Sequence, residues 1–507
     1  MRSGNATGFL STAICNTSAN GSSSFEMQAK LALIFIAAFV LYLVSRSPAL
    51  DEWDSVQFAL GLREFNLWKH QPHPPGYPLY IFLGRVGTRW FGWSPEFALE
   101  SVSCAGGALF VAAWFCIVRL QFGERFAWLL AGTLAVTPVV WMTATRALTD
   151  GLASGLLSAE LYWSLRLRTR PSCKQLTAAA LFAAAATGAR PQLLPVALLI
   201  LLAPLRRTSA KFRLTGGAIF IAGCLVWLLP TWYSQSALPG PVSGWRSYPA
   251  QLYSQWRWRF DHPGVFIGNE VSPTNIASRF AVHILGWFGI GLGLLWSPWV
   301  LVAGALLAAC GLVLYVARFD ARDGDFWKIH WSWAALLCAI VFCFLPGDQR
   351  YYMPIMPLLL VAVLRGLFQL PGALRFGALL LPAFLMSVSV PAAMESHREP
   401  APPIRLLQFL ERRYPPEQRR NVVLLLSHCQ RHFKWYAPDF TVYENTPLSA
   451  VPAEILAAAK AIYTDEPRQT RARGWQLVLD VEFSRSVVIY GKHHDVRLFR
   501  VQRINEP

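Results

Sequence analysis

Charged residues are scarce in this chain: they make up 15% of its 507 residues, while hydrophobic residues make up 54%. An ordinary soluble domain carries about 25% charged residues, so the composition argues against a soluble globular protein. Apolar runs recur from residue 31 to residue 391. Several reach the roughly 20 residues that a helix needs to cross a bilayer. We therefore expect an all-α polytopic membrane protein.

Three further features are missing. The nine cysteines form no CxxC pair or other zinc spacing, which argues against a structural zinc site. No internal repeat is visible along the chain. No small-residue cleavage site follows the first apolar run, so we expect no cleavable signal peptide.

Acidic residues are fewer than basic ones, 29 against 46, which gives a net charge of +17. Such a surplus can indicate nucleic-acid binding. Here the basic residues gather in short segments between apolar runs, such as RLRTRPSCK (166–174) and RRTSAKFR (206–213). Cytoplasmic loops of membrane proteins show this bias. We therefore expect the lipid bilayer, and not nucleic acid, as a partner.

The pattern divides the chain into three regions. Residues 1–30 are rich in Ser, Asn and Gly, and we expect a disordered tail inside the cell. Residues 31–393 hold about 11–12 predicted transmembrane helices. Residues 394–507 carry more charge and alternate helical and strand-like patterns, which predicts a small soluble α/β domain. The strand-like runs are NVVLLLS, FTVYEN, KAIYTDE, WQLVLDVEF and VVIYG. High arginine and alanine with low lysine suggest a bacterial source, hence the inner membrane.

The first outer loop, residues 47–97, holds the densest polar chemistry. Asp51, Glu52 and Asp54 stand together beside apolar residues. Apolar walls raise the pKa of a carboxyl group toward neutrality, which suits a general base. Any one of these acids alone could simply solvate the loop. Later in the loop, residues 78–92 are apolar but too short to span, and we predict an interfacial helix.

The segment HQPHPPGYPLY, which begins at His70, follows the acids in the same loop. Its prolines enforce an extended backbone, and this would present His73 rigidly near the carboxylates. The spacing of His70 and His73 would allow a metal ion to bind together with Asp54. We favour hydrogen bonding over ligation, while a divalent cation remains possible.

Arginines at predicted span ends are candidates for binding a phosphate, because the planar guanidinium makes paired hydrogen bonds. Arg190 lies in the turn of a helical hairpin, and Arg350 and Tyr351 lie in DQRYYMPIMP. Arg146 and Asp150 are four residues apart, so an ordinary helical salt bridge is the alternative for them. A headgroup anchor is the alternative for the other arginines.

The motifs together resemble a known family. LDEWDSVQFA (50–59) followed by HPPGYPLY (73–80) is similar to the Asp-Glu loop and the His-Pro-Pro motif of protein O-mannosyltransferases, which are GT-C membrane glycosyltransferases of the family 39 type. TRALTD (145–150) resembles that family's Arg…Leu-Asp stretch, and RYYMPIMP (350–357) its Arg-Tyr-x-x-Pro-x-x-Pro element. The sequence HQPHPPGYPLY most resembles that of a bacterial subgroup described as a domain of unknown function. The resemblance spans roughly residues 30–390.

This resemblance implies a GT-C fold and an enzyme that takes a sugar from a polyprenyl phosphate on the outer or lumenal face. It implies Asp51 as the catalytic base of an inverting displacement, with Glu52 holding the substrates. The other residues that we expect at the substrates are Asp54, His70, His73, Tyr77, Arg146, Asp150, Arg190, Arg350 and Tyr351. The acceptor would be a protein, a glycan or a lipid. Asp54 and the glycine after Pro75 depart from the family pattern and leave the sugar and the acceptor open.

Two other functions fit a polytopic chain. A transporter or lipid flippase of the cell envelope usually shows internal repeats and ionisable residues within broken helices, whereas here the charge lies in a loop. A membrane scaffold that binds a partner through its C-terminal domain would leave the polar chemistry of the first loop unexplained.

Overall fold

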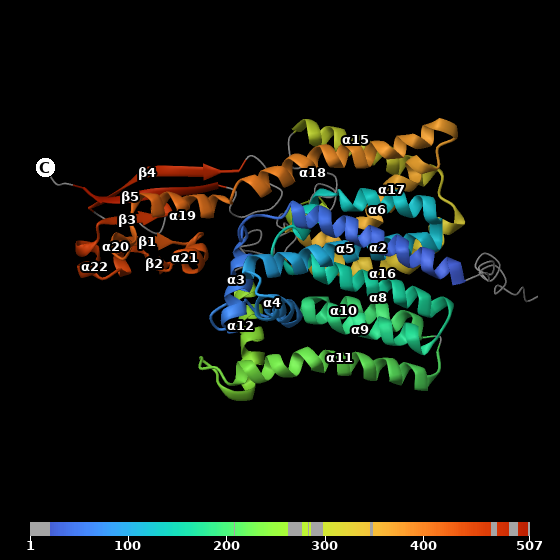
Figure 1. The fold of residues 1–507 in the computed structure, drawn as a ribbon, viewed down its shortest axis with the longest axis horizontal. Coiled ribbons are helices and arrows are strands. Elements are labelled where there is room, and N and C mark those ends of the chain that lie inside the picture. The colour runs from blue at the N-terminus through green and yellow to red at the C-terminus, as the bar shows by residue number, and fades with distance from the viewer. Residues whose placement is uncertain are drawn as a thin grey trace, which may run out of the picture.

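The computed structural model describes residues 21–206, 208–261, 276–281, 283–284, 298–344, 348–467, 474–485 and 495–504. Long helices run side by side in a bundle, and a small sheet domain lies at one end of it (Figure 1). The predicted fold class, a helical membrane protein with a C-terminal α/β domain, is confirmed.

The bundle is built from helices of varied length. They are α2 (Gly21–Val44), α5 (Pro95–Phe122), α6 (Glu124–Ala135), α7 (Pro138–Ala144), α8 (Thr149–Thr169), α9 (Cys173–Ala189), α10 (Leu194–Leu205), α11 (Ala210–Ser236), α15 (Pro298–Ala317), α16 (Ala321–Phe344), α17 (Met356–Phe368) and α18 (Leu380–Arg398). The disordered tail was expected to extend to residue 30, but α2 begins at Gly21, so residues 21–30 are helical. Residues 1–20 lie outside the described residues.

Six of the described helices are long and apolar enough to cross a membrane, and α6 with α7, bent by 60°, makes a possible seventh. The remaining predicted spans correspond to α8, α9, α10 and α15, which are shorter or less apolar. Part of the predicted span region 279–318 lies outside the described residues.

Helices α5 and α8 pack very closely through glycines. A Cβ atom on Gly106 would lie 2.3 Å from the Cα of Leu152, and one on Gly155 would lie 2.4 Å from the carbonyl oxygen of Gly106. Small residues allow membrane helices to approach this closely. The contact fixes the first turns of α8, and therefore Asp150, against α5.

The first outer loop is largely helical. It forms α3 (Trp53–Arg63) and α4 (Pro78–Trp90), and α4 coincides with the helix predicted over residues 78–92. Arg85 of α4 donates to the carbonyl oxygens of Gly61 and Leu62, at 3.0 and 3.2 Å, which caps the end of α3. Together with α12 (Ser247–Asp261), these helices lie at the end of the bundle that faces the sheet domain (Figure 1).

The C-terminal domain is a five-stranded mixed sheet with helices. Its strands are β1 (Val422–Leu426), β2 (Thr441–Glu444), β3 (Ala461–Thr464), β4 (Trp475–Ser484) and β5 (Asp495–Arg503), in the order β2-β1-β3-β5-β4. Its helices are α19 (Pro402–Arg413), α20 (Pro416–Arg419), α21 (Gln430–Tyr436) and α22 (Ala453–Ala458). Strand β1 pairs in parallel with β2 and β3 and is fully buried, as expected of a central apolar strand. The carboxyl end of β1 leads into α21, which contacts α3 of the membrane domain.

The predicted strands coincide with β1 to β4, and the run VVIYG (487–491) lies outside the described residues. Strand β5 was not predicted, although its sequence DVRLFRVQR alternates apolar and polar residues.

Candidate active site

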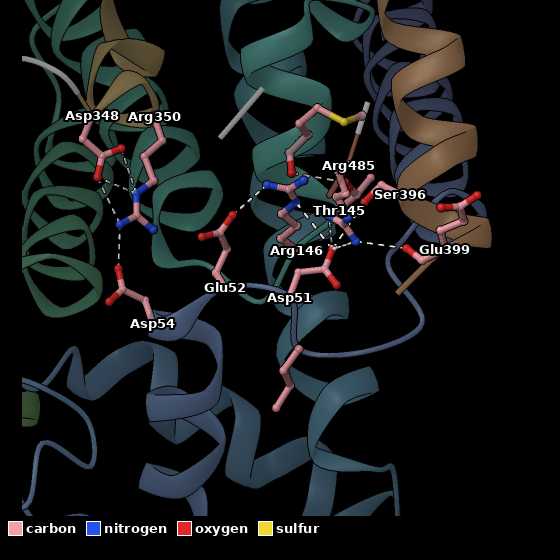
Figure 2. A network of polar contacts seen from close by, with 12 residues as sticks. Asp51, Glu52, Asp54, Thr145, Arg146, Asp348, Arg350, Ser396, Glu399 and Arg485 are labelled. Atoms are coloured by element: carbon pink, nitrogen blue, oxygen red, sulfur yellow. Dashed lines mark hydrogen bonds and ion pairs between the residues drawn. The ribbon is translucent and has the colours of Figure 1, made fainter. Parts of the chain in front are cut away.

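Asp51, Glu52 and Asp54 each face an arginine from a distant part of the chain (Figure 2). Asp54 accepts a hydrogen bond from Arg350 at 2.6 Å, and Glu52 accepts one from Arg146 at 2.8 Å. Asp51 accepts from Arg485, which lies just beyond the end of β4 in the C-terminal domain. The loop acids therefore form two neighbouring groups, one around Arg350 and one around Arg146 and Arg485.

The group around Arg350 continues toward Arg190. Arg350 also donates to both carboxylate oxygens of Asp348, at 3.2 Å each, and Arg190 pairs with Asp150. The guanidinium carbons of Arg190 and Arg350 lie 4.3 and 5.5 Å from the centre of the Tyr351 ring. One aromatic ring thus lies beside two arginines and brings them close together.

A cavity of about 330 Å³ opens beside these arginines. Its polar wall includes Asp150, Arg190 and Arg350. The other walls are mostly apolar and come from several elements. They include Pro74, Pro75, Ala153, Leu252, Trp256, Leu337, Ile340 and Val341. The cavity therefore offers cationic groups at one side and aliphatic surface at the other.

Asp54 is the most accessible of the three acids, with 27% of its side chain exposed against 2% for Asp51. Burial raises the pKa of the Asp54 carboxyl, but the charge of Arg350 outweighs it and holds this pKa well below its ordinary value. Asp54 is therefore ionised at neutral pH.

Asp51 is enclosed. Its Oδ2 atom accepts hydrogen bonds from both terminal nitrogens of Arg485, at 3.1 Å each, and lies 4.0 Å from Nε of Arg146. Its Oδ1 atom is buried and has no hydrogen-bond partner within the described part of the chain. The sequence analysis missed Arg485, because it stands 434 positions away from Asp51 and belongs to no motif.

His73 is held on both sides. Its Nδ1 atom donates to Oε1 of Gln57 at 2.6 Å, and the Tyr77 hydroxyl donates to its Nε2 atom at 2.7 Å. Burial lowers the pKa of His73 to about 3, so this histidine is neutral at pH 7. Its Nδ1 atom lies 3.8 Å from Oδ1 of Asp54, so His73 lies near one of the loop carboxylates, as expected.

The described residues do not fit a metal site. No cluster of three or more His, Cys, Asp or Glu side chains among them could hold an ion. His70 is exposed in a turn with φ of 53°, and both ring nitrogens of His73 are engaged.

The helical salt bridge between Arg146 and Asp150, the alternative considered for these residues, does not form in the structure. Helix α8 begins at Thr149, so Arg146 precedes it and does not share its face. Arg146 instead pairs with Glu52, and Asp150 pairs with Arg190.

Comparisons with known proteins give a family model and similar solved structures. Residues 72–233 match the family model described as dolichyl-phosphate-mannose-protein mannosyltransferase. The crystal structure of ArnT from Cupriavidus metallidurans bound to undecaprenyl phosphate is 13% identical, with a TM-score of 0.52 over 93% of this chain and 98% of that chain. Its apo state is 14% identical, with a TM-score of 0.50 over the same shares. A comparison with curated protein sequences gives no match. The chain has the fold of ArnT, and its resemblance to the GT-C membrane glycosyltransferases is confirmed.

Proposed function

We propose that the protein is a membrane glycosyltransferase that moves a sugar from a polyprenyl-phosphate donor to an acceptor at the end of the bundle that carries Asp54. The observation that carries this proposal is the cavity with Arg190 and Arg350 on one wall and aliphatic side chains on the others. The family match and the shared fold with ArnT, whose structure holds undecaprenyl phosphate, support it.

The cavity suits both parts of such a donor. Two guanidinium groups provide planar donors for phosphate oxygens. Leu337, Ile340 and Val341 of α16 offer an apolar surface for the first prenyl units. A volume of about 330 Å³ lies within the usual range for small-molecule sites, roughly 300–1,000 Å³.

We assign the base to Asp54. It is the more exposed of the two aspartates, and its partner Arg350 lines the cavity. Asp51, the base that the family resemblance implies, is buried against Arg485. The assignment of Asp51 stays a prediction, which the experiment below separates from that of Asp54.

The proposed reaction is an inverting displacement. The acceptor hydroxyl or amine attacks the anomeric carbon, the bond from this carbon to the phosphate oxygen breaks, and Asp54 takes the acceptor proton. Arg350 and Arg190 stabilise the charge on the departing lipid phosphate. Arrival of the donor phosphate also draws Arg350 away from Asp54, which raises the pKa of Asp54 from its lowered value and makes it a better base.

The deciding experiment uses proteoliposomes with labelled polyprenyl-phosphate sugar and a membrane extract as the source of acceptor. We expect the wild type to release free polyprenyl phosphate and Asp54→Asn to release none. Asp325→Asn serves as the matched control, because Asp325 is exposed and pairs along its own helix with Lys328.

Two other outcomes would change the assignments. Transport of the intact donor without cleavage would establish a flippase instead. Loss of release in Asp51→Asn but not in Asp54→Asn would return the base to Asp51. We further propose that the reaction takes place on the periplasmic face of a bacterial inner membrane, with a protein, glycan or lipid as the acceptor.

A further inference from the structure

We propose that the C-terminal domain is a working part of the active site, because it positions the acidic segment 50–54 for the reaction. This inference rests on the proposed glycosyl transfer. Two separate parts of the domain reach this segment: helix α21, and Arg485 just beyond β4.

Helix α21 holds the backbone on the N-terminal side of the acids. The N–H group of Leu50 donates to the hydroxyl of Tyr436 at 3.0 Å, and Nε2 of His432 donates to the carbonyl oxygen of Leu50 at 3.1 Å. Leu50 and His432 are both buried. Both polar backbone groups of the residue before Asp51 are thus satisfied by the C-terminal domain and not by the membrane helices.

Arg485 holds the side chain of Asp51. Its side chain is 8% exposed, and besides the two bonds to Asp51 it donates to the carbonyl oxygen of Glu399 at 3.0 Å. Removal of one partner of such a buried ion pair strongly destabilises the folded protein, since the other charge is left uncompensated. The pair therefore ties the position of Asp51 to that of the sheet domain.

Aromatic contacts complete the attachment. The guanidinium of Arg431 in α21 lies 4.4 Å from the ring centre of Trp53. Trp53 stands between Asp51 and Asp54 in the chain. In return, Arg63 of α3 lies 3.6 Å from the Trp435 ring centre, and the Trp435 indole donates to Glu96 at 2.9 Å. Contacts from α21 thus reach both the beginning and the end of α3.

The donor cavity has a different construction. All of its lining residues, from Pro74 to Pro354, belong to the membrane domain. Loss of an interdomain contact should therefore disturb the acids while leaving donor binding intact. This separation distinguishes a positioning role from a general loss of structure.

The test compares Arg485→Gln with Arg497→Gln, which removes an exposed arginine paired with Glu482 inside the same domain. We expect Arg485→Gln to lower kcat about tenfold to a hundredfold, because small displacements of reacting groups have effects of that size. The KM for the donor should stay within about twofold, since the donor cavity is intact. Arg485→Lys should restore part of the loss, and Arg497→Gln should match the wild type.

Hydrogen exchange provides a second measurement that needs no substrate. Amides of residues 50–56 should exchange about tenfold faster in Arg485→Gln and in the milder Tyr436→Phe, while those of α17 should not change. Unchanged exchange and unchanged kcat would overturn the inference, as would a rise in donor KM equal to the fall in kcat. If the wild type releases no polyprenyl phosphate, the proposed function fails, and the exchange measurement still decides whether the domain holds this segment.

Discussion

Charge pairing explains how Asp51, Glu52 and Asp54 fit into one short segment. Carboxylates at such close spacing repel one another, and each is compensated by an arginine from another region. The partners are Arg485, Arg146 and Arg350, which come from the C-terminal domain, the turn before α8 and the turn before α17. The acidic segment is thus stable only when three distant parts of the chain are assembled around it.

The Arg350–Asp54 pair leads to the first prediction. In Arg350→Gln, the carboxyl of Asp54 loses the charge that lowers its pKa, so this pKa rises and the acidic limb of the pH–rate profile moves to higher pH. The donor phosphate also loses a stabilising charge, and kcat/KM should fall about a hundredfold or more. Rates of polyprenyl phosphate release between pH 4 and pH 8 measure both effects. The exposed Arg246, changed to Gln, is the control, and an unmoved acidic limb in Arg350→Gln would contradict the assignment of Asp54.

His73 leads to a prediction about stability. Its pKa in the folded protein is about 3, against 6.5 for the ordinary group, so the unfolded chain binds the extra proton between these values. Stability should therefore fall as the pH is lowered from about 6.5 toward 3. Above that window, titration of His73 should not change the stability. In His73→Gln, the apparent Tm in detergent should fall less steeply with pH. Equal slopes in the variant and the wild type would show that His73 is not held neutral.

At the scale of elements, structure that depends on local pattern could be predicted. Helix α4 follows from a short apolar run, and β1 to β4 follow from short β-branched and aromatic runs flanked by turn residues. Strand β5 was not predicted because its arginines interrupt the apolar pattern. Val496 and Leu498 are buried on one side of the sheet, and Val501 is buried on the other. The start of α2 at Gly21 was not predicted because the first turns of this helix are polar.

The site was only partly predictable for a different reason. Sequence motifs brought out His73, Arg190 and Arg350, which do lie around one cavity or beside it. Pairings such as Glu52 with Arg146 depend on how the helices pack, and spacing along the chain says nothing about that. Arg485 lies in no motif, so only the packing of the sheet domain against the bundle shows its role.

The contact between α5 and α8 gives a prediction at this scale. In Gly106→Ala, the added methyl group would lie 2.3 Å from a backbone atom of Leu152, so the helices must separate. We expect a loss of about 1–3 kcal/mol, as for other overpacked cores, and a lower apparent Tm. Gly132→Ala is the matched control, because open space surrounds that position, and it should be neutral or stabilising. A Tm for Gly106→Ala equal to that of the control would contradict the close packing.

For the whole molecule, the proposed site and the C-terminal domain lie at the same end of the bundle, and the basic segment that contains Cys173 lies at the other (Figure 1). Helix α8 runs from Thr149, next to Asp150 at the site, to Thr169 over 21 residues, a length of about 31 Å. Cys173 at the start of α9 is exposed beyond that end. If the basic loops face the cytoplasm, the site and the sheet domain must face the periplasm.

This arrangement predicts which cysteines a membrane-impermeant maleimide reaches in intact spheroplasts. In a variant that retains only Cys173, labelling should require disruption of the membrane. In a cysteine-free variant that carries Ala457→Cys on the exposed surface of α22, labelling should proceed without disruption, because this position belongs to the domain that contacts the acidic segment. Labelling of both positions from the same side would contradict the predicted topology, and labelling with the two sides exchanged would move the proposed reaction to the cytoplasmic face.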